Sequence, residues 1–262
     1  MCFIFSPFLT VRSLSGFYGG KMGKIVGIIQ ARMGSTRLPG KSMMKIVGKP
    51  LLEHVIKRVK KCKTLDCIVV ATTKKKEDDV IVNLAEKLGV CWFRGSENDV
   101  LDRFLKAAEK FNANIIVRIC ADNPLIDPEE VDRLVKHHLE TNADYSYNHI
   151  PYPEGLPDGA GAEVLTIDTL RKVHKLATKQ EHREHVTLYI LENLDLFRTE
   201  RLSAKPELRK PQYRLDVDYM EDLEFIREIY RRLYKPGKII KLKDVIKLLD
   251  KQPELLKIRR ER

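Results

Sequence analysis

The residues best suited to chemistry stand in the loop Gln30–Lys41, whose sequence is QARMGSTRLPGK. The loop follows an apolar run typical of a buried strand, and its glycines and proline favour a loop over a helix. Arg32, Arg37 and Lys41 give it three cations. A strand followed by a glycine-rich, cationic loop is typical of phosphate binding in α/β proteins, because backbone N–H groups donate to phosphate oxygens while Arg and Lys neutralise charge. We therefore predict a phosphate site at the carboxyl end of strand 24–29.

The end of this loop nearly spells a Walker A motif, since Gly40-Lys41-Ser42 matches the last positions of G-x-x-x-x-G-K-[ST]. The first glycine should then stand at position 35, where the chain has serine. A Walker lysine also opens a long helix, whereas here a turn signal, Gly48-Lys49-Pro50, comes first. A P-loop ATPase is therefore the weakest of the functional alternatives.

Two acidic groups follow predicted strands and are candidates for binding Mg²⁺. Asp122 comes directly after strand 115–120, and a carboxylate facing a phosphate loop is a natural ligand for Mg²⁺, which prefers few carboxylates together with phosphate oxygens. Asp127 precedes Pro128, so we predict that it caps helix 128–141 instead. Asp216 and Asp218 alternate onto one face of a short run. For Asp218, metal binding competes with capping of helix 220–234, with Glu221 at its third position.

The elements that must position these residues alternate between strand and helix. We predict strands at 24–29, 67–71, 90–93 and 115–120, each apolar with little alternation, as expected when helices cover both faces of a sheet. Helices are predicted at 51–62, 77–88, 98–111 and 128–141. The first half is therefore a doubly wound, mostly parallel sheet. An inserted α/β segment follows, with strands 162–166 and 196–202, helices 167–178 and 182–193, and a Pro- and Gly-rich loop at 148–161. Such an insertion often shapes an acceptor site or a homodimer contact.

Composition bounds the class of protein. The chain has 262 residues and 43% hydrophobic residues, enough for one large α/β domain. No apolar run is long enough to span a membrane. Its five cysteines lack the spacing of a zinc site, and Cys67, Cys91 and Cys120 lie in or beside apolar runs where buried thiols are common. This usage predicts a reducing, cytoplasmic setting.

The net charge of +11 raises nucleic acid as a partner, but the charge is uneven. Residues 235–262 hold ten Lys or Arg and four Asp or Glu. The tail keeps helical periodicity in Leu242, Val245, Ile246 and Leu249, so we predict a basic-faced helix packed on the domain, within a C-terminal segment 236–262. No helix-turn-helix or aromatic-rich pattern accompanies the charge, which argues against nucleic acid.

Residues 1–22 differ from the rest. Residues 1–21 are apolar, contain no acid and lack the cationic start of a signal peptide. We expect 1–22 to be a disordered extension, or Met22 to be the true start, which leaves 23–235 as the main domain.

Several motifs together resemble the spore coat polysaccharide biosynthesis protein F family. That family belongs with the cytidylyltransferases that make CMP-sugars, such as acylneuraminate and 3-deoxy-manno-octulosonate cytidylyltransferases. The resemblance runs in order from about residue 24 to 235. The segments that carry it are Gln30–Lys41, Arg94–Arg103, Ala121–Asp127, Arg183–Thr187 and Leu215–Phe225.

The resemblance implies a nucleotide-diphospho-sugar transferase fold and a cytoplasmic enzyme that uses CTP, Mg²⁺ and a small-molecule acceptor. It implies that Arg32 and Lys41 bind the triphosphate and act in catalysis with Asp122, and that Asp122 and Asp218 hold Mg²⁺. The nucleotide site would comprise Gln30, Ala31, Arg32, Gly34, Ser35, Lys41, Thr72, Arg94 and Asp99. One departure is Asp218-Tyr219-Met220, where the family more usually has Asp-Thr-Pro.

The acceptor site is predicted from position alone, at Asn148, His149, Glu163 and His185. His185 could be a general base, an acceptor contact or a structural histidine. Two rivals to a cytidylyltransferase remain. A glycosyltransferase of the same fold would release a nucleoside diphosphate instead of pyrophosphate, and a basic nucleic-acid-binding module would bind with steep salt dependence and no metal.

Overall fold

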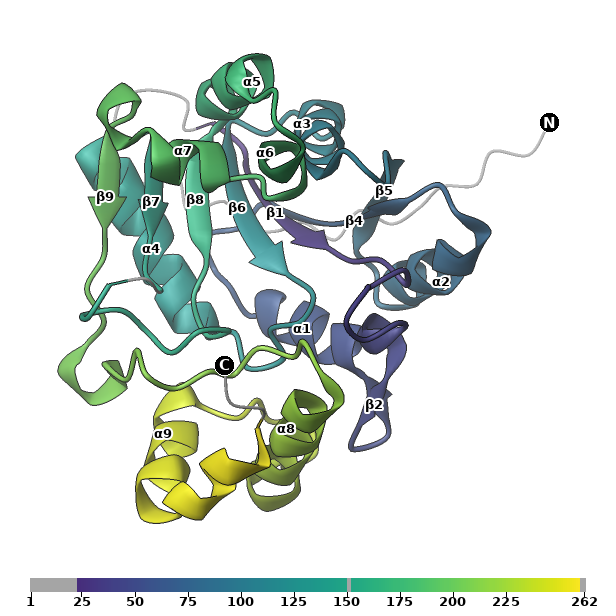
Figure 1. Ribbon diagram of the computed structural model, residues 1–262, viewed down its shortest axis with the longest axis vertical. Helices are drawn as coiled ribbons and strands as arrows, with labels where there is room; N and C mark the ends of the chain where they lie inside the picture. Colours follow the sequence, from purple (N-terminus) through teal and green to yellow (C-terminus); the bar gives the residue numbers. More distant parts are fainter. Residues whose placement is uncertain (1–22, 150–151, 260–262) are drawn as a thin grey trace.

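The computed structural model describes residues 23–149 and 152–259. Its centre is a seven-stranded sheet in the order β5-β4-β1-β6-β8-β7-β9 (Figure 1). The first four of these strands are parallel, β8 runs antiparallel to both neighbours, and β9 is parallel to β7. The strands span β1 (Ile25–Gln30), β4 (Cys67–Thr73), β5 (Cys91–Gly95), β6 (Ile115–Cys120), β7 (Tyr145–Tyr147), β8 (Glu163–Thr166) and β9 (Thr199–Arg201).

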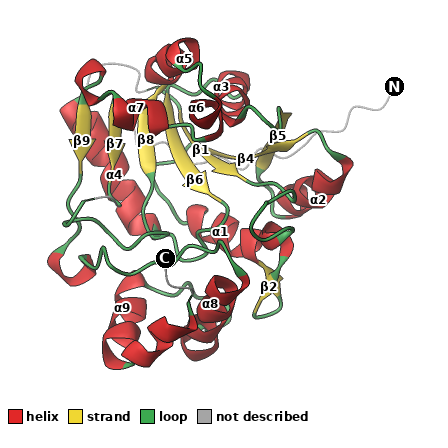
Figure 2. Ribbon diagram, viewed as in Figure 1, coloured by secondary structure: helices red, strands yellow, loops and turns green. Residues whose placement is uncertain are grey.

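Helices cover both faces of this sheet (Figure 2). Side chains of β1 alternate between two cores, since Ile25 and Ile29 pack into one and Val26 and Ile28 into the other. This double burial explains why the strand is apolar throughout, and it confirms the predicted doubly wound, mostly parallel fold. The helices are α1 (Leu51–Val59), α2 (Asp79–Lys87), α3 (Val100–Lys110), α4 (Pro128–Thr141), α5 (Ile167–Leu176), α6 (Gln180–Glu184), α7 (Leu188–Glu192), α8 (Met220–Leu233) and α9 (Leu242–Lys251).

The segment after the cationic loop excludes a Walker A helix. Lys41–Met43 forms one 3₁₀ turn, followed by the short hairpin of β2 (Lys45–Ile46) and β3 (Lys49–Pro50). Val47 and Gly48 between them have φ of 42° and 78°. Two positive φ angles in a two-residue hairpin loop match the twist of the strands, although a β-branched residue pays steric strain there.

The inserted segment departs from prediction in one place, because the helix predicted at 182–193 is two short helices, α6 and α7. His185 is non-helical at the break, with φ −104° and ψ 88°. Val186 and Thr187 are both buried, and the Thr187 hydroxyl donates to Glu163 at 2.9 Å. Tertiary contacts therefore turn these β-branched residues inward and override the helical pattern.

The C-terminal helix forms as predicted. Leu242, Val245, Ile246 and Leu249 on α9 are all buried in the core that α1 and α4 share.

The expectation of a buried Cys91 is wrong, since this residue is exposed on β5, the edge strand. In the ranges that the structure describes, every helix is too short or too polar to cross a bilayer. The predictions made for residues 1–22 lie outside the described residues.

Candidate active site

The cationic loop and both predicted acidic groups meet at one cavity of about 320 Å³, at the carboxyl ends of β1 and β6. Parallel strands bring segments far apart in sequence to the same edge of the sheet, where α/β proteins bind ligands. The lining residues are Gln30, Ala31, Arg32, Ser35, Thr36, Arg37, Lys41, Ser42, Arg118, Cys120, Ala121, Asp122, Glu184, His185, Asp216 and Asp218.

Lys41 joins the two predicted metal ligands. Its Nζ donates to Asp122 Oδ2 at 2.7 Å, to Asp218 Oδ1 at 3.0 Å and to the carbonyl oxygen of Val217 at 2.8 Å. Arg37 pairs with the second oxygen of Asp218 at 2.8 Å. Burial by itself would lower the pKa of Lys41, but the charges and hydrogen bonds of Asp122 and Asp218 outweigh it and the pKa is raised. Lys41 therefore stays a cation.

This arrangement fits a magnesium site. The carboxylates of Asp122 and Asp218 converge on a single cationic nitrogen, so their oxygens already face one point. Two carboxylates beside a phosphate loop, in a cavity with room for phosphate oxygens, are the donor set that Mg²⁺ prefers. We therefore take Asp122 and Asp218 as the residues that would hold the ion.

The start of α8 differs from the predicted cap, because Tyr219 is the N-cap residue. The Asp222 carboxylate accepts hydrogen bonds from the backbone N–H groups of Asp218 and Tyr219, each at 3.0 Å, at the start of α8. The predicted N-cap at Asp218 is therefore one residue too early, and Asp222 rather than Glu221 is the third helical residue. A role of Asp218 in metal binding stays a prediction. Asp127 does cap α4 as predicted, accepting from Glu129 N at 2.9 Å.

Four backbone amides of the cationic loop are hydrogen-bonded within the protein. Met33 N donates to Asp78 Oδ1 at 2.7 Å, while Ser35 N and Gly40 N both donate to the Met33 carbonyl. Lys41 N likewise donates to Leu38 O. These four groups have partners within the protein, so phosphate binding by amides of this loop stays a prediction.

Four residues predicted for the nucleotide site do not line this cavity. Gly34 lies beside acidic side chains, where an added Cβ would meet Glu77 at 3.3 Å. Thr72 is fully buried, and its hydroxyl lacks a hydrogen-bond partner among the described residues. Arg94 pairs with a carboxylate of α2, and Asp99 caps α3 while accepting from Arg183 Nε at 2.9 Å. Their nucleotide contacts stay predictions.

Of the four predicted acceptor residues, only His185 reaches the cavity wall. Asn148 is buried, and its side chain bridges the backbone of Glu130 and Ala162. His149 forms an isolated bridge with Leu156. These bonds are structural, so a role of Asn148 or His149 in acceptor binding stays untested.

Glu163 is the centre of a buried network behind the cavity. It pairs with Arg118 and accepts from Tyr145 Oη at 2.6 Å and Thr187 Oγ1 at 2.9 Å. Burial would raise the pKa of Glu163, but the Arg118 guanidinium, with hydrogen bonds from Tyr145 and Arg118, lowers it to about 2. Glu163 is therefore ionised, and it orients Arg118, which does line the cavity.

Arg118, Cys120 and Glu184 are among the cavity residues that sequence reasoning missed. A signal for the first was present, because Arg118 is a lone cation within the apolar strand IIVRIC and must find a carboxylate partner. Burial raises the pKa of Cys120 to about 12, so this thiol is protonated and a poor nucleophile. Glu184 pairs with Arg32 at 3.4 Å, and this contact could not be foreseen from residues so far apart in sequence.

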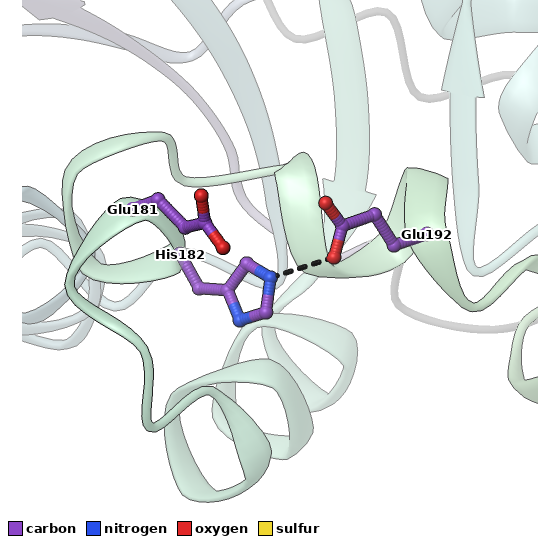
Figure 3. A group of neighbouring side chains, drawn as sticks. All are labelled: Glu181, His182 and Glu192. Atoms are coloured by element: carbon purple, nitrogen blue, oxygen red, sulfur yellow. Dashed lines mark hydrogen bonds and ion pairs between the residues drawn. The ribbon is translucent and has the colours of Figure 1, made fainter.

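A separate cluster lies between α6 and α7. Glu181, His182 and Glu192 have ligand atoms within 4.8 Å of one another, and Figure 3 shows His182 joined to Glu192. His182 is buried, and its Nε2 lies 2.8 Å from Glu192 Oε2, while both glutamates are exposed. We interpret this contact as a brace between the two short helices that flank His185.

The fold is shared with solved cytidylyltransferases. The model of the cytidylyltransferase family matches residues 26–252, and the chain belongs to that family. It is therefore a CTP-dependent nucleotidyltransferase, and the family resemblance is confirmed.

Individual relatives agree with this assignment. An uncharacterised protein of Methanocaldococcus jannaschii is 42% identical over 237 residues, covering 90% of this chain and 94% of the relative. The spore coat polysaccharide biosynthesis protein SpsF of Bacillus subtilis is 37% identical over 239 residues, covering 89% and 97%. A solved cytidylyltransferase of Leptospira borgpetersenii superposes with a TM-score of 0.84 at 31% identity, covering 92% of this chain and all of that one.

Proposed function

We propose that this enzyme transfers CMP from CTP to a hydroxyl group of a sugar or sugar acid and releases pyrophosphate, in the biosynthesis of a polysaccharide or glycoconjugate. The observation that carries the proposal is the convergence of Lys41, Asp122 and Asp218 at one end of a cavity whose loop adds Arg32 and Arg37. The spore coat relative supports the biosynthetic role.

Each residue has a part that follows from its charge and place. Asp122 and Asp218 would hold Mg²⁺, which when bound neutralises triphosphate oxygens and fixes their geometry. Lys41 exchanges its carboxylate partners for phosphate oxygens and stabilises the charge that develops as pyrophosphate leaves. Arg32 is half-buried, and among the described residues it pairs with the exposed Glu184 at 3.4 Å, so it can turn to phosphate at little cost.

The acceptor is expected on the side of the cavity formed by His185 and Arg118. A guanidinium at this wall suits an acceptor that carries a carboxylate, because Arg binds carboxylates through two parallel hydrogen bonds. His185 is the candidate general base for the attacking hydroxyl. The preference for cytosine is expected to come from polar groups that match its N4 donor and O2 and N3 acceptors.

The experiment is a pyrophosphate-release assay with CTP, UTP, ATP and GTP, each with Mg²⁺ and a panel of neutral sugars, sugar acids and polyols. We expect release only with CTP, and faster release with sugar acids than with the matching neutral sugars. Release of a nucleoside diphosphate from a nucleotide sugar would point to the glycosyltransferase alternative instead.

Two variants connect the assay to the site. Arg32→Ala and Lys41→Ala should each weaken CTP binding measured by calorimetry, while circular dichroism shows that both variants are folded. Arg201→Ala is the matched control, since Arg201 is an exposed cation on β9 outside the cavity. Equal binding of all four triphosphates, or CTP binding that ignores both substitutions, would contradict the proposal.

A further inference from the structure

A second cavity, of about 420 Å³, lies away from the active site, between α1, the end of α8 and the loop that leads to α9. In Figure 1 α1 and α8 are found in the lower half of the molecule. The lining residues are Lys49, His54, Lys57, Arg58, Lys60, Lys61, Leu88, Tyr230, Tyr234, Gly237, Lys238, Ile239 and Ile240. It shares no residue with the nucleotide cavity, and its size suits a small-molecule ligand.

The charged side chains that line this cavity are all basic. Five lysines line it, and none of its lining residues within the described ranges is acidic. Lys57 has a carboxylate partner outside the lining, Glu53 at 2.6 Å. Lys60, Lys61 and Lys238 are exposed. Positive charges around one cavity repel one another, and they raise the local concentration of anions. A bound anion would therefore reduce this electrostatic repulsion.

The wall of the cavity is aromatic and apolar. Tyr230 and Tyr234 are stacked with ring centroids 6.1 Å apart, and Lys49 lies 5.8 Å from the centre of the Tyr234 ring. Leu88 and Ile240 extend the apolar surface. Flat rings stack favourably on aromatic side chains, so the wall suits a ligand with a ring as well as a charge.

The floor of the cavity is held firmly and is therefore preformed. Arg58 is fully buried and donates through Nε to Ile126 O at 2.5 Å and through Nη1 to Ile240 O at 2.8 Å. Tyr230 Oη donates to Pro124 O at 2.7 Å. Both side chains thus anchor the turn that follows Asp122, and a ligand in this cavity would rest on the same scaffold as the active site.

We propose that the cavity formed by α1, α8 and the loop before α9 binds a small molecule that combines a flat ring with a phosphate or similar multiply charged anion. The lysines at and just after the end of α1 and the lysine of the loop hold the anion, and Tyr234 with Leu88 contacts the ring. This site is distinct from the CTP pocket and does not depend on the proposed acceptor.

The test is calorimetry of the full chain, without divalent metal, using 1-naphthyl phosphate as the probe. Inorganic phosphate and 1-naphthol carry its two halves separately. We expect 1-naphthyl phosphate to bind at least about tenfold more tightly than either, because charge and ring contacts add. The variant Lys61→Ala/Lys238→Ala removes exposed cations from two sides of the cavity and should weaken binding on the order of tenfold.

Two controls locate the probe. Lys136→Ala removes an exposed lysine from α4, outside the cavity, and Arg32→Ala disables the nucleotide cavity. Both should leave probe binding unchanged. The proposal is overturned if the probe does not bind, if 1-naphthol binds as well as its phosphate, or if affinity falls in Arg32→Ala and not in Lys61→Ala/Lys238→Ala. Binding of pentaglutamate without binding of 1-naphthyl phosphate would also overturn it, in favour of an acidic peptide.

Discussion

Replacing Glu163 by glutamine should destabilise the protein strongly, because Glu163 is the carboxylate partner of the deeply placed Arg118. Glutamine keeps an oxygen for the hydrogen bonds from Tyr145 and Thr187 but removes the negative charge. Breaking a buried ion pair by removing one partner costs about 3–5 kcal/mol, since the other charge is left uncompensated. For a domain of this size, that cost corresponds to a fall in melting temperature of roughly 6–20 °C.

The pKa of Glu163 determines the pH range in which this stabilisation is lost. Its value falls from the ordinary 4.5 to about 2 in the folded protein. Because the folded-state pKa is lowered, this stabilisation is fully present above pH 4.5 and is lost as the pH falls from 4.5 toward 2.

The assay is thermal or urea unfolding of wild type and Glu163→Gln between pH 7 and pH 2.5. The gap in the free energy of unfolding should be largest near neutral pH and should narrow below pH 4.5. Glu109→Gln is the matched control, because Glu109 forms an exposed pair with Arg171 at 3.2 Å and should change stability by less than about 1 kcal/mol. A gap below 1 kcal/mol, or one that stays constant with pH, would refute the reasoning.

The same variant separates a structural role from direct acceptor binding. Assayed well below its melting temperature, Glu163→Gln should keep the KM for CTP. A selective rise in the KM for the acceptor, with no loss of stability, would restore Glu163 to the acceptor site.

Three further predictions concern the metal site, the turn that carries it and the C-terminal helix. Asp122→Asn should keep the fold yet lower the rate of pyrophosphate release on the order of a hundredfold. The control Asp168→Asn, which changes an exposed acid on α5, should have no effect. Near-normal turnover of folded Asp122→Asn would remove Asp122 from the metal site. Tyr230→Phe loses the hydrogen bond to Pro124 and should cost about 1 kcal/mol in urea unfolding, and an unchanged midpoint would mean that this bond does not stabilise the turn. Leu249→Ala should lower the free energy of unfolding by about 2–5 kcal/mol, because α9 packs into the main core. Lys247→Ala, which changes an exposed residue of the same helix, should lower it by almost nothing. Equal unfolding midpoints for these two variants would show that α9 adds no stability.

Local patterns determined most of the framework of this protein. The continuous apolar runs of β1, β4 and β6 demanded burial on both sheet faces, and a doubly wound sheet provides that burial. The cationic loop and Asp122 each directly follow such a strand. Because parallel strands end at the same edge of a sheet, their meeting there was predictable from the sequence. Asp127 likewise carried its capping role in the residues next to it.

Tertiary structure decided the rest, because those choices depend on partners distant in the chain. Glu163 belongs to the core because Arg118, 45 residues earlier, needs a counter-charge there. The cap of α8 forms at Tyr219 rather than Asp218, and Asp222 rather than Glu221 accepts from the nearby amides, a choice that two acids with similar local spacing leave open. The break between α6 and α7 follows from the burial of Val186 and Thr187 against the sheet, and no helical periodicity records a contact with another element. The local propensities of the residues determine which helices and strands form. The partner of a buried charge is determined only when these helices and strands pack together.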